Sequence, residues 1–252
     1  MSTMFEIVQD NPCPYLTDRV ATTAYRLNEG CSAEKYQRLL ERGWRRFGLT
    51  FFRPVCVGCA ECRSLRIDVP SFRPNRSMRR TAEANLDLDV TLQPASLSRQ
   101  HLALYDRYHD DMHDRRGWTE RESSPADYHH TFVEGRESWG HELLFRLDGQ
   151  LVCVALVDIL PGAMSAVYSY YDPTLRRRGL GVQAVLTQVE IARSRSLPFL
   201  YLGYWIEGNA SMRYKARYRP HEILHGRPEL SSPPQWRAPS SGQSEPVSRS
   251  RG

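Results

Sequence analysis

Three cysteines lie close together in the sequence, with two residues between neighbours. Cys56, Cys59 and Cys62 form the run CVGCAEC. Two intervening residues let neighbouring thiolates reach one metal ion through a tight turn, where Gly58 eases the backbone. A distant fourth thiolate, such as Cys13, would complete a set for zinc or an iron–sulfur cluster. The spacing also fits reduced thiols on a turn without a metal, so both interpretations stay open.

Arginine supplies nearly all of the positive charge. The chain has 32 Arg and only two Lys, and its formal net charge is +5. A genome-wide exchange of Lys for Arg would explain the total, but residues 63–80 hold six Arg against a single acid, Asp68. A phosphate backbone rewards such an excess, because Arg binds phosphate in a bidentate manner and stacks on bases. The segment predicts a nucleic-acid contact through Arg63, Arg66, Arg76, Arg79 and Arg80.

The composition is that of a globular protein. Of the 252 residues, 40% are hydrophobic and 10% aromatic, which supplies a core for one large or two small domains and excludes disorder throughout. The longest apolar stretch, residues 151–160, is about half of the roughly 20 residues that a membrane-spanning helix needs. No basic start followed by an apolar run marks a secretory signal. We therefore expect a cytoplasmic protein with no membrane contact.

Periodicity predicts a mixed α/β protein. Helices are expected at residues 33–47, 96–111, 182–195 and 209–219. Strands are expected at residues 50–57, 64–69, 142–147, 151–159, 163–171 and 199–206. Residues 112–131 fit either a helix or an ordered loop, and His109 and His113 are interpreted as surface residues in preference to a metal pair. We expect an N-terminal cysteine-containing, RNA-contacting region (residues 1–95), a catalytic domain (96–230) and a disordered Ser/Pro-rich tail (231–252).

One succession of elements in the second half is typical of an acyltransferase core. A strand is followed by Arg-x-x-Gly-x-Gly, a helix, a second strand and a second helix. This order resembles the GCN5-related N-acetyltransferase (GNAT) superfamily. Glycines at a helix N-terminus let backbone N–H groups approach an anion such as a pyrophosphate. Arg176, Gly179 and Gly181 are therefore candidate substrate contacts, although a fold does not identify the substrate.

Longer motifs resemble one family over residues 11–228. They are CPYL from Cys13, CRSLRI from Cys62, YYDP from Tyr170, YLGYWI from Tyr201 and MRYKA from Met212. Together they resemble the arginyltransferase (R-transferase) family, and most closely its bacterial branch of aspartate/glutamate leucyltransferases.

The resemblance implies an aminoacyltransferase with a GNAT-like core. Such an enzyme moves an amino acid, Leu in preference to Arg, from aminoacyl-tRNA to the N-terminal amine of proteins that begin with Asp or Glu. This transfer marks those proteins for degradation in the N-degron (N-end rule) pathway. Eukaryotic relatives bind an iron–sulfur cluster or metal through N-terminal cysteines, which by analogy would be Cys13, Cys56, Cys59 and Cys62 here.

The transfer depends more on aligning the two reactants than on activating the ester. An aminoacyl ester is already activated, so the enzyme has to align a neutral amine with the carbonyl and stabilise the oxyanion. An α-amino group with a pKa near 7.7–8.0 has an appreciable neutral fraction. The chemistry therefore requires no metal, covalent nucleophile or other cofactor.

We expect the site between the strands at residues 168–172 and 201–205. The expected catalytic residues are Tyr171 or Tyr204 as hydrogen-bond donor or proton relay, Asp172 as acceptor of the amine proton, and Lys215 as the group that holds the acidic side chain or the tRNA end.

Two other functions stay open at this point. An acetyl-coenzyme A-dependent N-acetyltransferase would use the glycine loop, but it leaves the cysteines and the arginine-rich segment unexplained. A non-catalytic, metal-stabilised RNA-binding protein leaves the acyltransferase core idle. The expected partners are aminoacyl-tRNA and proteins with N-terminal Asp or Glu, and no DNA.

Overall fold

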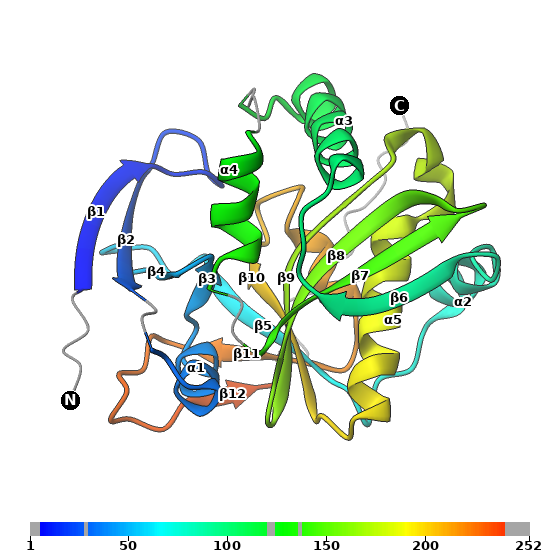
Figure 1. Ribbon diagram of the computed structural model, residues 1–252. Coiled ribbons are helices and arrows are strands. Elements are labelled where there is room, and N and C mark those ends of the chain that lie inside the picture. Colours follow the sequence, from blue (N-terminus) through cyan, green and yellow to red (C-terminus); the bar gives the residue numbers. More distant parts are fainter. Residues whose placement is uncertain (1–5, 28–29, 120–123, 136–137, 240–252) are drawn as a thin grey trace, which may run out of the picture.

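The computed structural model describes residues 6–27, 30–119, 124–135 and 138–239, and its strands form two sheets (Figure 1). The small sheet has the order β1-β2-β4-β3 and the large sheet the order β12-β11-β5-β10-β9-β8-β7-β6. The strands are β1 (Glu6–Pro12), β2 (Val20–Leu27), β3 (Arg45–Phe47), β4 (Thr50–Pro54), β5 (Arg63–Asp68), β6 (Asp89–Pro94), β7 (Gly140–Leu147), β8 (Gln150–Leu160), β9 (Ala163–Tyr171), β10 (Phe199–Trp205), β11 (His221–His225) and β12 (Gln235–Arg237).

Helices cover both faces of the large sheet (Figure 1). The helical segments are α1 (Ala33–Leu40), α2 (Arg76–Glu83), α3 (Arg99–Arg116), α4 (Pro125–Tyr128), the π-helix η1 (His129–Val133), α5 (Leu180–Ser194) and the 3₁₀ segments η2 (Pro173–Arg178) and η3 (Arg213–Arg217). Cys153 and Ala155 of β8 pack in the core beneath α5, whereas Val154 and Leu156 pack beneath α3. Alternate residues of a strand face opposite sides, so this continuously apolar strand is buried on both. The predicted mixed α/β class is confirmed.

The predicted acyltransferase order is also confirmed for its first four elements. Strand β9, the glycine loop, helix α5 and strand β10 follow one another, and β10 lies parallel to β9. Strands β7 and β8 form a hairpin that turns at Asp148 and Gly149, which both have positive φ, as the favoured two-residue hairpin turn requires.

Strands β9 and β10 pair only over a short length. Their recorded pairs join Leu200 to Met164 and Tyr201 to Ser165. Beyond these pairs β9 stays bonded to β8 and β10 to β5. The register of β10 against β5 shifts between Tyr201 and Gly203, and Gly203 has φ +86°, a conformation that L side chains rarely adopt. This bulge re-aims β10 next to the separating strands.

Two predicted helices are wrong in extent or type. The helix predicted for residues 33–47 ends at Leu40, because the chain turns through Gly43 (φ +84°) and enters β3. Residues 209–219 form only the 3₁₀ segment η3. Asn209 does not cap a helix there: its side chain instead bonds the carbonyl of Tyr15 and the N–H of Ser211. Of residues 112–131, which were left open, the described part is helical at both ends.

The predicted disordered tail begins too early. Residues 235–237 form β12, which pairs with β11, and the indole N–H of Trp236 donates to the carbonyl of Glu41 at 3.0 Å. Arg66 lies over the Trp236 ring at 4.4 Å. Burial of one aromatic side chain thus anchors a segment whose composition predicts disorder. Residues 240–252 lie outside the described part of the chain.

The large sheet uses both sides of the division predicted at residue 95. Strands β5 and β6 come from the N-terminal part, yet β5 pairs with β10 and β6 with β7. The division stays a prediction about function, because the sheet itself does not separate there. In the described ranges no helix is long and apolar enough to cross a membrane.

Candidate active site

A cavity of about 650 Å³ opens where β9 and β10 separate. Its walls come from β3, β4, the end of α3, β9, α5, β10 and the segment around η3. Of the described residues that line it, seven are Arg or Lys and none is Asp or Glu. The cavity lies between residues 168–172 and 201–205, where the site was expected, although this agreement does not test the role of any residue.

Arg45 is the most unusual side chain of the cavity. It is 7% exposed, and its Nη1 donates to Ser165 Oγ at 2.9 Å. Its Nε and Nη2 are buried without a hydrogen-bond partner among the described residues. Burial lowers the pKa of this guanidinium. An unpaired buried donor costs about 1–3 kcal/mol, and more when it is charged, so these two groups point to an anionic ligand.

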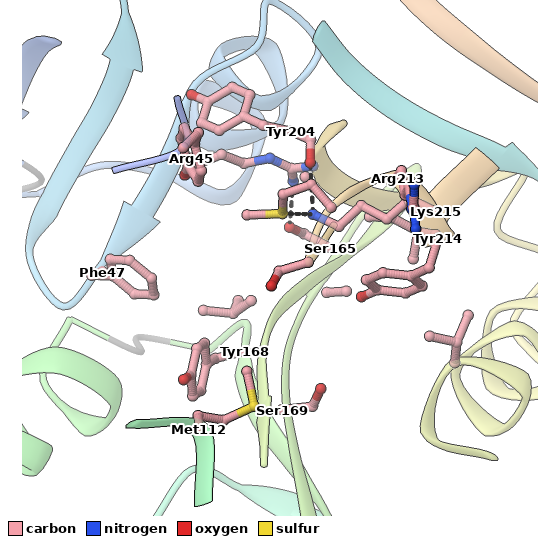
Figure 2. A pocket seen from close by; sticks show the side chains of 18 of the residues that line it. Arg45, Phe47, Met112, Ser165, Tyr168, Ser169, Tyr204, Arg213, Tyr214 and Lys215 are labelled. Carbon is pink, nitrogen blue, oxygen red and sulfur yellow. Dashed lines mark hydrogen bonds between the residues drawn. The ribbon is translucent and has the colours of Figure 1, made fainter. Parts of the chain in front are cut away.

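Lys215 converges on the same place from η3 (Figure 2). It is 8% exposed, and its Nζ donates to the backbone carbonyl of Tyr204 at 2.7 Å. Burial, followed by repulsion from Arg45, lowers its pKa to about 7. A Cβ on Gly203 would lie 3.5 Å from both Arg45 Nη2 and Lys215 Nζ. The missing side chain of Gly203 thus leaves room beside two buried cations. We call Arg45, Ser165, Gly203 and Lys215 the cationic end.

The buried carboxylate of Asp158 does not neutralise this pair. It accepts from Arg46 Nε at 2.9 Å and from the Tyr36 hydroxyl at 2.6 Å, and a second bond from Arg46 reaches its other oxygen. Asp158 is therefore committed to Arg46, the sequence neighbour of Arg45. The cationic end keeps an excess of positive charge.

The opposite part of the cavity is aromatic and apolar. Phe47 stacks on Phe52 with ring centroids 5.3 Å apart, and Tyr168 stacks on Phe132 at 5.4 Å. Met112 and Tyr168 lie on the side of the cavity away from Lys215 (Figure 2). We call Phe47, Phe52, Met112 and Tyr168 the aromatic end. Its surface suits an apolar side chain of moderate size.

Tyr168 also connects the cavity to a buried histidine. Its hydroxyl is 3.0 Å from His109 Nε2, and His109 Nδ1 is 2.8 Å from the carbonyl oxygen of Tyr105. A carbonyl only accepts, so Nδ1 carries a hydrogen, and in the neutral ring Nε2 accepts from Tyr168. The imidazole of His109 can therefore take up a proton from the cavity through the Tyr168 hydroxyl. His109 is buried, so its interpretation as a surface residue is wrong, whereas His113 is exposed.

Three of the four predicted catalytic residues line the cavity, and Asp172 does not. Tyr171 and Lys215 line the cavity, and burial raises the pKa of the Tyr171 hydroxyl. Tyr204 also lines it, but its hydroxyl donates to backbone carbonyls, that of Gly43 at 2.8 Å being the closer. This leaves no hydroxyl hydrogen for a substrate and contradicts the predicted donor role. Tyr204 instead forms a wall, and its carbonyl holds Lys215.

Asp172 is not among the described residues that line the cavity. Its Oδ1 accepts from Thr174 N at 2.9 Å and from Thr174 Oγ1 at 2.6 Å, which caps η2. Its Oδ2 lies 3.4 Å from Arg107 Nη2. A carboxylate engaged in capping a turn outside the cavity does not suit the predicted role as proton acceptor.

The predicted RNA-contacting arginines differ in whether they form ion pairs or ring contacts within the protein. Arg63 lies over the Trp205 ring at 4.3 Å and 3.6 Å from Glu207. Arg66 pairs with Glu222 at 2.6 Å. In contrast, Arg76, Arg79 and Arg80 are exposed on α2 without an acidic partner among the described residues. Only these three present free charge from the predicted set.

Backbone conformation and packing account for Gly179, whereas Gly181 has room for a Cβ. A Cβ on Gly179 would meet Thr81 of α2 at 3.2 Å, and Gly179 has φ +67°. A Cβ on Gly181 would lie 3.5 Å from the Tyr171 ring. Arg176 pairs with Asp111 at 3.0 Å. The helix α2 therefore lies against the N-terminus of α5, and the contact of this loop with a phosphate stays a prediction.

The four predicted metal-binding cysteines lie near one another, Cys13 just after β1 and the other three in the turn between β4 and β5. Interaction with Cys13, Cys56 and Cys59, added to burial, raises the pKa of Cys62 to about 12. Arg227 donates to the carbonyls of Cys56 and Cys59 and so holds the turn. Yet no three His, Cys, Asp or Glu side chains of the described chain converge as metal ligands do. The thiols suit zinc or an iron–sulfur cluster in chemistry but not in the present positions of their sulfurs.

Arg45 and Ser165 are functional candidates that the sequence pattern does not single out, and His109 is considered from the sequence only as a metal ligand or a surface residue. Arg45 is one of 32 Arg, and Ser165 is an ordinary polar residue in an apolar strand. A signal for Arg45 does exist, since an Arg pair at residues 45–46 between aromatic residues is unusual for a solvent-exposed helix face. His109 shares its face of α3 with Tyr105, which favours burial.

Comparison with known proteins finds relatives that match most of the chain. The family described as arginine-tRNA-protein transferase matches twice, its N terminus over residues 11–80 and its C terminus over residues 100–225. An aspartate/glutamate leucyltransferase from Campylobacter jejuni is 41% identical over 221 residues, which are 88% of this chain and 92% of that protein. The protein of the same name from Halorhodospira halophila is 44% identical over 226 residues, with coverage of 85% and 91%.

Solved structures give weaker likenesses. FemX has a TM-score of 0.44 at 9% identity, with 79% of each chain covered. A GCN5-related N-acetyltransferase from Kribbella flavida has a TM-score of 0.37 at 17% identity, with 65% of this chain and 57% of that chain covered. Both scores lie below 0.5, too low for a conclusion.

Proposed function

Because this chain belongs to the arginine-tRNA-protein transferase family, we propose that it transfers leucine from Leu-tRNA to the N-terminal amine of proteins that begin with Asp or Glu. The relatives that carry the name aspartate/glutamate leucyltransferase support this choice of donor and acceptor. The modified proteins would enter degradation through the N-degron pathway.

The cationic end carries the proposal. Arg45 and Lys215 are buried, converge beside Gly203 and meet no acid among the lining residues that the structure describes. The side-chain carboxylate of an N-terminal Asp or Glu supplies the missing charge, and Arg45 Nε and Nη2 offer it two donors. Charge-assisted bonds of this kind are about twice as strong as neutral ones. An acceptor that begins with Ala would leave the cations unpaired.

The aromatic end favours Leu over Arg as the donated residue. Phe47, Phe52 and Met112 offer an apolar surface to a leucyl side chain. An arginyl side chain would enter a cavity that already holds seven cations and, among its described lining, no carboxylate. Burial of an unpaired guanidinium is costly, so the donor pocket disfavours Arg-tRNA.

The transfer then needs one proton to move. The neutral amine attacks the ester carbonyl, a C–N bond forms and the C–O bond to the tRNA ribose breaks. We place the amine proton on the Tyr168 hydroxyl as that group passes its own hydrogen to His109 Nε2, and the imidazolium returns the proton to the leaving ribose oxygen along the same path. The net change is one ester bond for one amide bond, with no proton gained or lost.

We propose a structural role for the cysteines. Zinc or an iron–sulfur cluster on Cys13, Cys56, Cys59 and Cys62 would tie the start of the chain to the cysteine turn. Tyr15, two residues after Cys13, lines the cavity, and its carbonyl is held by Asn209 at 2.8 Å. A metal would thereby stiffen one wall, and no step of the transfer uses it. Metal analysis of protein purified without oxygen tests this role.

We also propose that α2 contacts the body of the tRNA through Arg76, Arg79 and Arg80. Their exposure without acidic partners in the described chain supports the contact. Replacing all three by Gln should weaken the binding of full-length tRNA. It should also make the affinity for tRNA less dependent on salt concentration.

A donor and acceptor matrix tests the function. The protein is incubated with labelled Leu-tRNA, Arg-tRNA or acetyl-coenzyme A and with peptides that begin with Asp, Glu or Ala. We expect label only from Leu-tRNA on the Asp and Glu peptides. Label from acetyl-coenzyme A would establish an N-acetyltransferase instead, and tRNA binding without any transfer would establish an RNA-binding protein.

A further inference from the structure

Four arginines surround the mouth of the cavity, and we propose that they bind the single-stranded 3′ end of the donor RNA. Arg115 and Arg116 end α3, while Arg213 and Arg217 belong to η3. All four line the cavity and all four are exposed. We call them the arginine rim. The inference rests on the proposed function, because it names the surface that presents the ester to the cavity.

The arginine rim has more positive charge than the protein neutralises. Arg115 pairs with Asp111, four residues earlier in α3. Arg116, Arg213 and Arg217 have no ion pair in the described ranges of the chain. This differs from Arg63, Arg66 and Arg176, whose charges are met by acids of the protein. Three unpaired guanidinium groups at one opening match the regular negative charge of an RNA backbone.

Aromatic side chains stand between these charges. Tyr214 lies in η3 between Arg213 and Lys215 (Figure 2), lines the cavity and is 39% exposed. Trp118 follows α3 and also lines the cavity. Bases of single-stranded RNA stack on exposed aromatic rings, because every base has a π-face. Tyr214 is therefore the platform that we assign to the terminal base.

The arrangement also fixes the direction of the RNA. The aminoacyl ester is attached to the last nucleotide, so this nucleotide lies just inside the opening, with its base on Tyr214 and its leucyl group directed toward the aromatic end. The preceding phosphates then pass outward over the arginine rim. The contact by α2 proposed above would meet a part of the tRNA further from its 3′ end.

The test separates the arginine rim from other charge. The variant R116Q/R213Q/R217Q is compared with R99Q/R177Q/R195Q, which removes three exposed arginines that do not line the cavity. The affinity for uncharged tRNA and for a short RNA that ends in CCA is measured at salt concentrations from roughly 50 to 200 mM. The affinity of phosphate contacts changes strongly over this range.

We expect the rim variant to bind both RNAs at least about tenfold more weakly at low salt. Its slope of log affinity against log salt should fall by about 2, because each phosphate contact on a single strand contributes about 0.7. The control variant should match the wild-type protein within about twofold. Leucyl-adenosine, a donor without phosphates, should serve the wild-type protein and the rim variant equally, which shows that the variant is folded.

Two results would overturn or redirect the inference, and a third bears on the proposed function alone. An unchanged salt slope in the rim variant would remove the arginine rim from RNA binding. A rise in KM for acidic peptides, with RNA affinity intact, would assign the arginine rim to the acceptor polypeptide. Failure of the wild-type protein to use Leu-tRNA would overturn the proposed function alone, because the binding measurements need no turnover.

Discussion

The two ends of the cavity use opposite physical means to select a substrate. At the cationic end, Arg45 and Lys215 are both buried, and two donors of Arg45 lack a partner among the described residues, so the folded protein is left with an electrostatic cost that an anion relieves. At the aromatic end, Phe47 stacks on Phe52, and Met112 packs within a buried apolar cluster. A ligand there gains apolar contact without correcting any deficit.

This difference predicts unequal discrimination. A site with unsatisfied buried donors rejects a ligand that lacks the matching group far more strongly than an apolar pocket rejects a ligand of slightly different size. We therefore expect strict selection of the acidic acceptor and looser selection among apolar donors. The following variants test that asymmetry.

Replacement of Arg45 should have the largest effect. We expect Arg45→Met to lower kcat/KM for Asp and Glu peptides by on the order of 100- to 1,000-fold, because a buried charge-assisted pair is lost. The free energy of unfolding should rise by about 1 kcal/mol, since an apolar side chain replaces an uncompensated charge. Arg46→Met is the matched control and should destabilise the protein, because it strands Asp158. A loss of stability in the Arg45 variant would contradict our view of the cationic end.

Removal of the Tyr168 hydroxyl comes next. Tyr168→Phe keeps the stacking on Phe132 but breaks the path to His109, so we expect kcat to fall about 100-fold with little change in the KM of either substrate. His109→Gln should lower kcat and alter its pH profile in parallel. If the Tyr168 variant changes KM alone, the residue belongs to substrate binding and the proton takes another route.

The third test uses pH at Lys215. In the folded protein this group loses its proton near pH 7 instead of near 10.5, so it is charged and binds the acceptor carboxylate best below pH 7. Lys215→Met should raise the KM for an Asp peptide about tenfold at pH 6.5 and progressively less above pH 8.

Stability of the same variant has its own pH dependence. The unfolded chain binds the proton more tightly than the folded one, so stability owed to Lys215 rises with pH between about 7 and 10.5. Below pH 7 the buried charge costs the fold most, and Lys215→Met should then raise the thermal midpoint most. A variant that is less stable at low pH would rule out the buried charge as a cost.

The smallest effect is expected at the aromatic end. Phe47→Ala should lower kcat/KM for Leu-tRNA about 5- to 10-fold, the scale at which an apolar pocket registers lost contact, and should leave the KM for acidic peptides unchanged. Phe47→Leu should be nearly neutral. A loss above 100-fold would show that the two ends select with similar strength.

Much of the fold could be predicted from residues that are close together in the sequence. The two positive φ values at Asp148 and Gly149 follow from an Asp-Gly pair between apolar strands, and β9 ends at the predicted residue before Asp-Pro. The apolar periodicity of α5 requires only nearby residues. Predictions failed where distant contacts override local preference: β12 is ordered because Trp236 reaches Glu41 and Arg66, and η3 is short where Asn209 bonds Tyr15.

Arg45 and Arg46 mark the limit of what the sequence by itself determines. Pattern and composition determine the strands, the principal helices and, through long motifs, the family. Pattern and composition do not distinguish the role of Arg45 from that of Arg46. Only the tertiary structure brings Asp158 to Arg46 across 112 positions and leaves Arg45 beside Gly203, Ser165 and Lys215. Charge pairing acts through space over a few ångströms, so which arginine is satisfied and which awaits a ligand is decided by the fold.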